Sequence, residues 1–378
     1  MVPIKRKMCV MCKGSLVDLH RFEDFPIYMG VADLSIEHDQ HCDMIFSKCK
    51  SCGMVQLRNL IPLEILYAKG HAAVIGPTWK KHHDEFYEFI KDSVYGNIVE
   101  IGGANLMLSK KLADLEQINK ITVFDNNILQ YQDDKKINDK IVLREEFFNP
   151  DKLSENVDVI IHTHLIEHLY NPLEEIYEMS KLLKNGSQMM FAFPLADEML
   201  KSNFTNAMNF EHSYFIDMSI AEAILNFSNF EITKTKNFSP YAAFVIATKK
   251  EGIKQKASLK NLNHEQIFEG FYQHHYNDVQ RIIKELENNK EETFIFGAHI
   301  FTQFLFGFGL KEECFLNVLD NDPAKIGNRL YGTKLQIKSP KILKDIKNPV
   351  VVLKAAMYTD EIKEDILKNI NPNTRFIL

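Results

Sequence analysis

The sequence predicts an α/β protein built from a small N-terminal module and two α/β units, the second of them smaller. Five of the six cysteines lie in the first 52 residues, whereas short apolar strands alternate with helical segments from about Pro77 onward. Such alternation is typical of βαβ units with a mostly parallel sheet. A Lys-rich, weakly apolar stretch at 249–263 separates the two α/β units. We therefore expect domains at 1–75, 76–250 and 251–378.

Length and composition indicate a globular protein with more than one core. The chain has 378 residues, more than an ordinary single domain, and 45% of them are hydrophobic. The net charge of −6 argues against a nucleic-acid binder. No apolar run approaches the ~20 residues of a membrane span, and residues 1–9 lack the apolar core of a secretory signal. We expect a cytoplasmic protein, and its oligomeric state stays open.

Strand and helix signals follow one another along both α/β units. In the middle unit, short apolar segments predict strands at 98–101, 120–124, 140–143, 157–161 and 188–193. Helical patterns lie between or beside these strands, at 79–94, 106–115 and 173–183, the last one ended by Lys184-Asn185-Gly186. In the last unit, a helix is expected at 264–288 and strands at 293–296, 315–319 and 349–353.

Two Cys-x-x-Cys pairs mark the N-terminal module. Cys9 and Cys12 form the first pair, and Cys49 and Cys52 form the second, which is followed by Gly53. Four thiolates can surround one tetrahedral Zn²⁺. A closed set of four sulfur ligands leaves no open position, so the expected ion is structural rather than catalytic. The alternative is four unrelated buried cysteines.

Residues that follow three strands of the middle unit favour a site for an adenosine-containing cofactor. Gly102 and Gly103 come between the first strand and a helix, where small residues let the backbone approach a ligand. Asp125 follows the second strand, and its carboxylate can accept hydrogen bonds from two ribose hydroxyls. After the third strand, Glu146 and Phe147 can contact the edge and face of an adenine. The alternative is an ordinary strand-to-helix turn without a ligand.

The fourth strand narrows the class of cofactor. The run 157–172, the turn 182–187 and a strand ending at Pro194 resemble a class I S-adenosylmethionine-dependent methyltransferase, a Rossmann-like fold. In such enzymes the segment after this strand lines the methyl donor, which implies His164 there; a histidine capping the sheet edge is the alternative. Glu167 and His168 are interpreted as structural. The expected cofactor contacts are Glu100, Gly102, Gly103, Asn105, Asp125, Asn126, Glu146, Phe147 and His164.

Nearly the whole chain resembles the three-domain sugar methyltransferases, a family best known for C-methylating nucleotide-linked keto-deoxysugars. The paired cysteines, the run 320–327 (DNDPAKIG) and the segment 210–215 (FEHSYF) carry the resemblance. It implies a zinc-binding module, a methyltransferase domain and a C-terminal Rossmann-like domain, with a nucleotide-linked sugar held between the last two. It also implies His212 as the general base, because an imidazole is mostly neutral at cytoplasmic pH. Glu211 would orient His212 or bind a sugar hydroxyl, and Tyr214 would do the latter.

Two departures from the family pattern bear on the reaction. Leu106 replaces the last glycine of a loop that usually reads Glu-x-Gly-Ser-Asn-Asp-Gly, which implies that the methionine end of the donor is held differently or more weakly. Residues 71–77 and 208–210 lack the tyrosines and serines of the C-methylating members. We therefore favour O-methylation of a sugar hydroxyl, with His212 as base. The alternative is C-methylation of a keto sugar through an enolate.

Two further classes of protein stay open. One is an NAD-linked oxidoreductase, because the C-terminal unit resembles half of a dinucleotide fold. Its first strand runs into Gly297-Ala298 without a G-x-G-x-x-G pattern, which argues against NAD. The other is a non-catalytic zinc-ribbon adaptor, and Leu106 in the glycine loop keeps that alternative open.

Overall fold

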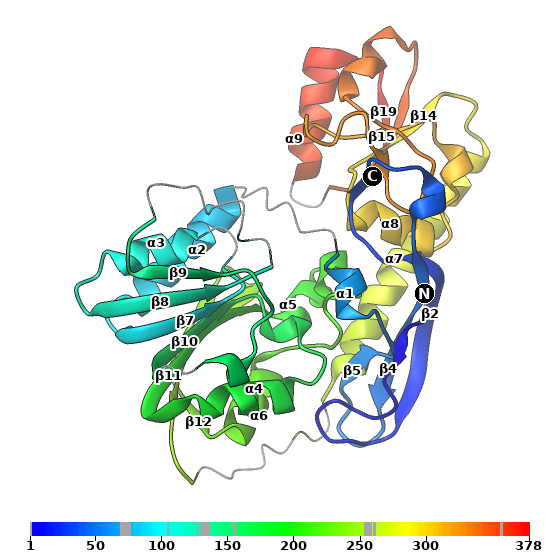
Figure 1. The fold of residues 1–378 in the computed structure, drawn as a ribbon. Coiled ribbons are helices and arrows are strands. Elements are labelled where there is room, and N and C mark those ends of the chain that lie inside the picture. Colours follow the sequence, from blue (N-terminus) through cyan, green and yellow to red (C-terminus); the bar gives the residue numbers. More distant parts are fainter. Residues whose placement is uncertain are drawn as a thin grey trace.

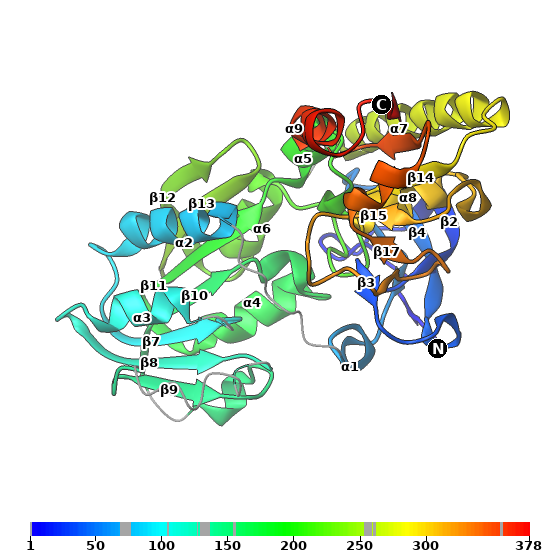
Figure 2. The ribbon, with the colours of Figure 1, turned by 90° about the horizontal axis from the view of Figure 1, so that it is seen from above.

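The structure is a computed structural model that describes residues 2–68, 77–103, 106–126, 128, 137–153, 156–252, 259, 262–355 and 358–378. The chain forms two lobes (Figure 1). The middle unit makes up one lobe, and the N-terminal module and the C-terminal unit together make up the other (Figure 2). The predicted α/β class is confirmed.

A seven-stranded sheet forms the middle lobe. Its order is β12-β13-β11-β10-β7-β8-β9, and β13 alone runs antiparallel to its two neighbours. This order, with one antiparallel strand inserted near an edge, is that of the class I methyltransferase fold. The strands are β7 Gly96–Ile101, β8 Ile118–Phe124, β9 Ile141–Arg144, β10 Val157–Thr163, β11 Leu183–Pro194, β12 Phe230–Phe238 and β13 Ala242–Lys249.

Both faces of this sheet are covered by helices, which explains why its central strands are apolar throughout. In β10, Val159 and Ile161 pack in the core beneath α2 (Pro77–Ile90) and α3 (Met107–Ala113). Ile160, on the opposite face, packs in the core beneath α4 (Pro172–Lys181) and α6 (Met218–Phe227). Alternate residues of a strand point to opposite faces, so a strand covered on both sides reads as a continuous apolar run.

The predicted start of β11 is wrong. The strand expected from Gln188 begins at Leu183, so Lys184-Asn185-Gly186 belongs to β11 rather than to the end of a helix. Leu183 pairs with Val157, and an irregularity between Val157 and Val159 absorbs the extra residues of β11. The local turn signal was real, because Gly186 has φ +89°, but it marks an irregular strand start.

The C-terminal unit is built on a five-stranded, fully parallel sheet. Its order is β17-β15-β14-β18-β19. The strands are β14 Thr293–Phe296, β15 Val318–Leu319, β17 Ile337–Lys338, β18 Val350–Leu353 and β19 Arg375–Ile377. The helices are α7 His264–Glu287, α8 Ile300–Gly307 and α9 Thr359–Asp365. Among the described helices, none has both the length and the apolar character needed to cross a bilayer.

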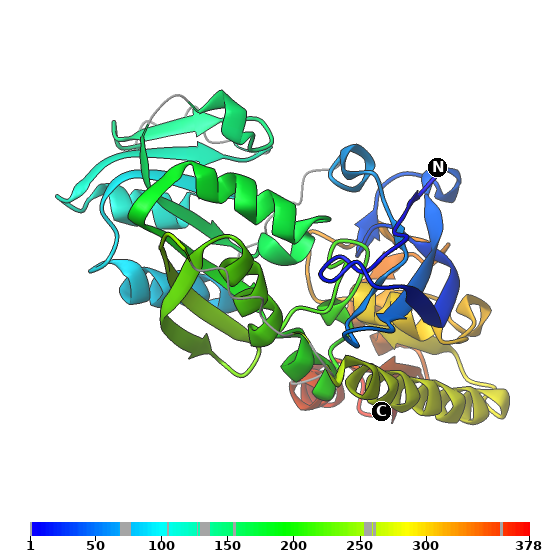
Figure 3. The same cartoon turned by 90° about the horizontal axis from the view of Figure 1, so that it is seen from below.

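The N-terminal module is a small antiparallel sheet that shares a hydrophobic core with the C-terminal unit. Its main strands are β2 Leu16–Pro26, β4 His41–Cys49 and β5 Val55–Leu57, flanked by a β1 (Ile4–Lys5) and β6 (Asn59–Leu60) pair and by α1 (Leu63–Leu66). Phe22 of β2 packs against Phe304 of α8 and against Phe308, which directly follows α8, with ring centroids 5.5 and 5.0 Å apart. Phe46 of β4 packs against Phe268 of α7 at 4.6 Å. Figure 3 shows α7 running along this lobe.

Polar contacts strengthen the same interface. Strand β3 (Val31–Ala32) pairs with β16 (Arg329–Leu330) of the C-terminal unit. The Arg329 guanidinium donates to both carboxylate oxygens of Asp39, at 2.5 and 2.6 Å, and both side chains are buried. A two-pronged ion pair of this kind fixes orientation as well as distance.

The N-terminal module also holds the middle lobe. Strand β5 pairs with the segment after α5 (Ala196–Lys201): Leu57 N donates to Ser213 O, and Phe215 N donates to Val55 O, both at 2.9 Å. The Arg6 guanidinium donates to Ser213 O at 2.8 Å and to Tyr170 O at 3.0 Å. Burial lowers the Arg6 pKa to about 10, which leaves it charged at neutral pH. One buried cation thus ties two loops of the middle lobe to the N-terminal module.

Arg6→Met should lower the free energy of unfolding by about 2–3 kcal/mol, because buried carbonyl acceptors lose a charged donor. Thermal unfolding of the two proteins measures this difference. Lys7→Met, at the exposed neighbouring position, is the matched control and should change stability little. Equal unfolding midpoints for Arg6→Met and Lys7→Met would contradict the role given to Arg6.

Candidate functional site

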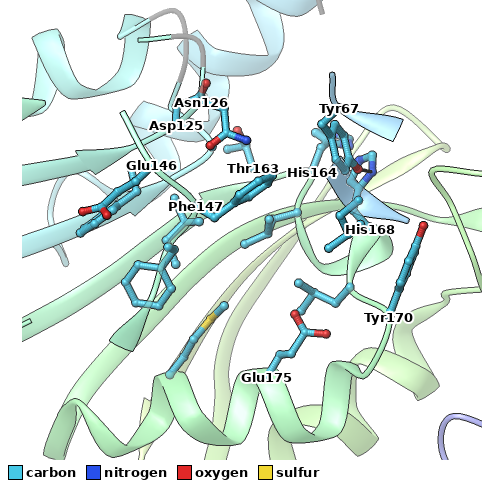
Figure 4. A pocket seen from close by; sticks show the side chains of 18 residues that line it. Tyr67, Asp125, Asn126, Glu146, Phe147, Thr163, His164, His168, Tyr170 and Glu175 are labelled. Atoms are coloured by element: carbon cyan, nitrogen blue, oxygen red, sulfur yellow. Dashed lines mark hydrogen bonds between the residues drawn. The ribbon is translucent and has the colours of Figure 1, made fainter. Parts of the chain in front are cut away.

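A cavity of about 410 Å³ lies at the carboxyl ends of β7, β8, β9 and β10 (Figure 4). Ligands of open parallel sheets bind at this edge. The N-terminal module contributes Leu63 and Tyr67 to the wall. The remaining lining residues are Ile101, Gly102, Phe124, Asp125, Asn126, Glu146, Phe147, Phe148, Thr163, His164, Leu165, His168, Leu169, Tyr170, Glu175 and Met179.

At one end of the cavity the structure gathers most of the residues expected at the cofactor. Asp125, Asn126, Glu146 and Phe147 lie together there (Figure 4). Gly102, with φ +79°, lines the floor. These residues follow three different strands, and the parallel order of β7, β8 and β9 brings them to one edge.

Gly103 is a position that only glycine fits. A Cβ atom there would lie 2.7 Å from Val123 Cγ1 and 2.9 Å from Glu100 Cδ, both closer than atoms normally approach. The sequence prediction that this turn needs small residues therefore has a packing reason beside any ligand contact. Asn105, also expected at the cofactor, lies outside the described residues.

Two of the described residues expected at the cofactor, Glu100 and Gly103, do not line the cavity. Glu100 is the more informative of the two. It is buried beneath the glycine turn, where Ser109 Oγ donates a hydrogen bond to Oε2. Burial, together with the nearby Asp125 charge, raises the Glu100 pKa to about 7 despite the opposing effect of the Ser109 hydrogen bond. The group therefore supports the turn from below.

Leu106 adopts a left-handed backbone conformation, which favours glycine. Its φ of +53° is in the left-handed region, and its N–H donates to Gly103 O at 2.9 Å. That conformation costs an L-residue roughly 1–2 kcal/mol. The Leu106 side chain is fully buried, and burying a leucine contributes about 1.5–3 kcal/mol. Burial of the side chain thus offsets the strain of the left-handed backbone at this position.

Histidines and carboxylates gather at the other end of the cavity. His164, in the expected place, has Nδ1 3.0 Å from Glu167 Oε1 and Nε2 3.3 Å from His82 Nε2. His168 also lines the cavity, and its Nδ1 lies 2.9 Å from the Tyr67 hydroxyl. Figure 4 shows Tyr67, His164 and His168 on the same side of the cavity.

Glu167 is a buried carboxylate at the centre of this group. Burial opposes its ionisation, but the His164 hydrogen bond and the charges of His164, His168 and His212 outweigh burial and hold the Glu167 pKa at about 2. Glu167 is therefore ionised at all working pH values. Its Oε2 atom has no hydrogen-bond partner among the described residues.

The predicted base, His212, lies beside this group. Its ring centroid is 4.9 Å from that of His168, and its Nδ1 is 3.3 Å from Ala207 O. Asn209 Oδ1 accepts hydrogen bonds from the backbone N–H groups of Glu211 and His212, at 2.8 and 3.2 Å, which fixes the turn that carries both side chains.

Tyr214 is placed differently from its neighbours. Its side chain is fully buried, its hydroxyl donates to Ile166 O, and burial raises its pKa well above 10. It is not among the residues that line the cavity. Through Ile166 it braces the turn that carries Glu167 and His168.

Three residues at this end were not predicted as site residues. Glu167 and His168 were interpreted as structural, although the histidine-rich run 162–168 was a signal of their location. Tyr67 had no such signal, because it belongs to the N-terminal module, and only the packing of that module brings it to the cavity.

The four predicted metal-binding cysteines also come together. Their sulfur atoms lie within 4.8 Å of one another, with Cys9 and Cys52 3.8 Å apart and Cys12 and Cys49 3.4 Å apart. Sulfurs bound at ~2.3 Å to a tetrahedral zinc ion lie about 3.8 Å from each other. The donor set and its spacing therefore fit Zn²⁺.

Residues 233–378 match the protein family described as the C-methyltransferase C-terminal domain. No curated protein matches the chain significantly. The chain is similar in structure to an N-methyltransferase, NodS, from Bradyrhizobium japonicum (16% identity, TM-score 0.37, covering 50% of this chain and 97% of that one). It is also similar to an S-adenosylmethionine-dependent methyltransferase from Mesorhizobium loti (11%, 0.37, 46% and 99%).

The match to the C-methyltransferase C-terminal domain covers the C-terminal part of the chain. Together with the strand order of the middle sheet and the four-cysteine cluster, this makes the chain a three-part S-adenosylmethionine-dependent methyltransferase. The oxidoreductase and adaptor alternatives are not supported. Between the two methylation reactions, the family match favours C-methylation, the alternative in the sequence analysis, over the preferred O-methylation.

Glu100→Gln should flatten the pH dependence of stability between about pH 4.5 and 7. Because the pKa is raised in the folded state, from 4.5 to about 7, the stability it contributes is present below pH 4.5 and is lost as pH rises to about 7. The loss amounts to roughly 3 kcal/mol, at ~1.4 kcal/mol per pKa unit. Unfolding midpoints from pH 5 to 8 test this. The exposed Glu116→Gln should keep the wild-type profile, and a Glu100→Gln profile that also matches wild type would contradict the assignment.

Proposed function

We propose that the protein transfers the methyl group of S-adenosylmethionine to a carbon atom next to the ketone of a nucleotide-linked sugar. The observation that carries this proposal is the match of residues 233–378 to the C-methyltransferase C-terminal domain. S-adenosylmethionine supplies an already activated methyl group, so the protein must supply alignment and a means of removing a proton.

The donor would occupy the cavity of the middle lobe. Asp125 and Asn126 would hold its ribose, Glu146 and Phe147 its adenine, and the Gly102 turn its methionine end. Asp125 and Phe147 lie at the same end of the cavity. His164, at the other end, would face the sulfonium group, which places the methyl group next to His168 and His212.

His212 would take the proton from the carbon next to the ketone. The carbon–hydrogen bond breaks, its electron pair forms the enolate, and the enolate carbon then bonds to the methyl group. The Ala207 carbonyl, 3.3 Å from Nδ1, accepts the N–H there and leaves Nε2 as the proton acceptor. Glu211 would orient this ring or bind a sugar hydroxyl. We infer a positioning role for Tyr214, through the Ile166 carbonyl.

The acceptor has room between the middle and C-terminal units. A second cavity, of about 740 Å³, is lined by residues of the segment 202–206 and by Gly297, His299, Lys325 and Lys354 of the C-terminal unit. The segment continues to Ala207, which contacts His212. An acceptor that reaches from this cavity toward His212 would place its nucleotide on the C-terminal unit and its sugar at the base.

Exchange of a carbon-bound proton separates C-methylation from O-methylation. With S-adenosylhomocysteine bound and no methyl donor, the wild-type protein should exchange the proton next to the ketone of a keto sugar nucleotide with D₂O, faster than the protein-free sample. NMR follows the loss of that proton signal. With the methyl donor present, the product should carry a new carbon–methyl bond. Methyl transfer to oxygen, with no proton exchange, would overturn the proposal.

His212→Ala should lower both proton exchange and methyl transfer by ~10²-fold or more, as expected for the loss of a general base. Binding of S-adenosylhomocysteine and the unfolding midpoint should stay near wild type, because His212 is outside the donor end of the cavity. The exposed His38→Ala is the matched control and should leave both rates unchanged. Near-normal turnover by His212→Ala would remove His212 from the mechanism.

We also propose that Cys9, Cys12, Cys49 and Cys52 bind a structural Zn²⁺. The support is the sulfur spacing and the hydrogen bond from Ser51 N to Cys49 Sγ at 3.3 Å, a contact that stabilises a thiolate. Because Cys52 lies three residues before β5, an ion here would also hold the strand that pairs with Ser213 and Phe215.

Cys49→Ser should abolish zinc binding and unfold the N-terminal module, because a structural zinc contributes ~10–16 kcal/mol in zinc-finger peptides. Methyl transfer should fall with it. Zinc content by atomic absorption and the thermal unfolding curve measure the effect. Cys314→Ser, at the exposed cysteine outside the module, should keep one zinc per chain. A fully active, metal-free Cys49→Ser protein would contradict the structural role.

A further inference from the structure

Three potential metal ligands meet beside the donor cavity, and one of them, His168, lines it. Glu167 and His168 come from the turn after β10, and His212 comes from the segment after α5, more than 40 residues later. One ligand atom of each lies within 4.8 Å of those of the other two. The group is separate from the four-cysteine cluster, and it has a different donor chemistry.

Glu167 provides an independent sign that something is bound here. Its side chain is 0% exposed, and only Oε1 is engaged, by His164 Nδ1 at 3.0 Å. Oε2 is buried without a hydrogen-bond partner among the described residues. A buried carboxylate oxygen left without a partner is costly, and a bound cation would be a physical reason to keep it.

Each of the three side chains is also held by an outer partner. A histidine that binds a metal through one ring nitrogen has the other fixed by a hydrogen bond. The Ala207 carbonyl takes this position for His212, and the Tyr67 hydroxyl takes it for His168, at 3.3 and 2.9 Å from the respective Nδ1 atoms. His164 takes the equivalent position for the Glu167 carboxylate.

Donor type, charge and space fit a divalent transition metal. Two imidazoles and one carboxylate are the ligand set of many catalytic zinc and non-haem iron sites, which keep further positions open. Ligands at ~2.1 Å from a tetrahedral ion lie about 3.4 Å apart, so ligand atoms within 4.8 Å of one another would need to approach by at most about 1.4 Å. The buried Glu211 next to His212 adds negative charge, and the cavity that His168 lines gives access.

We propose that Glu167, His168 and His212 form a second, open site for a divalent transition metal ion, and that an ion bound there inhibits methyl transfer. A coordinated nitrogen cannot accept a proton, so the ion would withdraw His212 from catalysis. The inhibition rests on the proposed function of His212, whereas the binding does not. The two parts are therefore tested separately.

Binding is tested with Co²⁺ on protein whose cysteine site is filled with zinc. One further equivalent of Co²⁺ should bind, with visible d–d absorption but without the thiolate charge-transfer band that cobalt in the cysteine site would give. Glu167→Gln and His168→Gln should each weaken Co²⁺ binding by at least ~10-fold. Substitution of a residue that only holds a ligand in place already costs about that much affinity, and these two residues are ligands themselves. The exposed His38→Gln should bind as wild type does.

Inhibition is tested by methyl transfer at increasing Zn²⁺. Wild type and His38→Gln should lose activity, and a mild chelator that leaves the cysteine zinc in place should restore it. The zinc concentration that halves the metal-free rate should be at least ~10-fold higher for His168→Gln than for wild type. Unfolding midpoints and S-adenosylhomocysteine binding verify that the variants are folded.

Two kinds of outcome would overturn parts of the proposal, and a third would overturn the proposed function while leaving the metal site. No further equivalent of Co²⁺, or equal binding by wild type, Glu167→Gln and His168→Gln, removes the site. Binding with unchanged or increased methyl transfer removes the inhibitory role and leaves a metal site of another function. If instead His212→Ala is active while Co²⁺ still binds to wild type, the proposed function fails and the metal site stands.

Discussion

The pairing of β5 with the segment that carries His212 is the interaction on which the site depends. Two backbone hydrogen bonds of 2.9 Å join Val55 and Leu57 to Phe215 and Ser213, and the Arg6 guanidinium reinforces them from the same module. Since His212 directly precedes Ser213, a strand of the N-terminal module helps to set the position of the His212 ring. The cysteine cluster, three residues before β5, therefore belongs to the architecture of the site.

The two ends of the cavity are built by different kinds of structure. Its donor end is built by the sheet, where Asp125, Glu146 and Gly102 follow parallel strands and reach one edge by topology alone. Its other end combines one contact between domains, from Tyr67 to His168, with a group inside the middle lobe, where His212 stands beside the buried Glu167. The first kind of geometry follows from the parallel sheet, and the second follows from loops and from the packing of the N-terminal module. Differences in reaction among proteins of this fold are thus expected at the second end.

Part of this site could be read from single residues and their spacing. The sequence indicates the function of three features: four cysteines in two pairs, glycines after a strand, and an acidic residue after the next strand. Each of these residue types has few chemical uses at that spacing. The left-handed conformation of Leu106 could not be read in this way. A leucine there suggests a lost glycine, and only the structure shows its left-handed backbone and the full burial that offsets the strain. The start of β11 was misread because a glycine turn signal looks the same at a helix end and at an irregular strand start.

The sequence by itself determined the α/β class, the middle methyltransferase-like unit and the residues gathered at the donor end, because hydrophobic periodicity and strand order act locally along the chain. Only the tertiary structure decided that the N-terminal module and the C-terminal unit share one core, through Phe22, Phe304 and Phe308. Only the tertiary structure showed that the Tyr214 hydroxyl contacts the Ile166 carbonyl and that Glu167 and His168 lie next to His212. Contacts between residues more than 40 positions apart depend on how whole surfaces pack, and no local pattern encodes that packing.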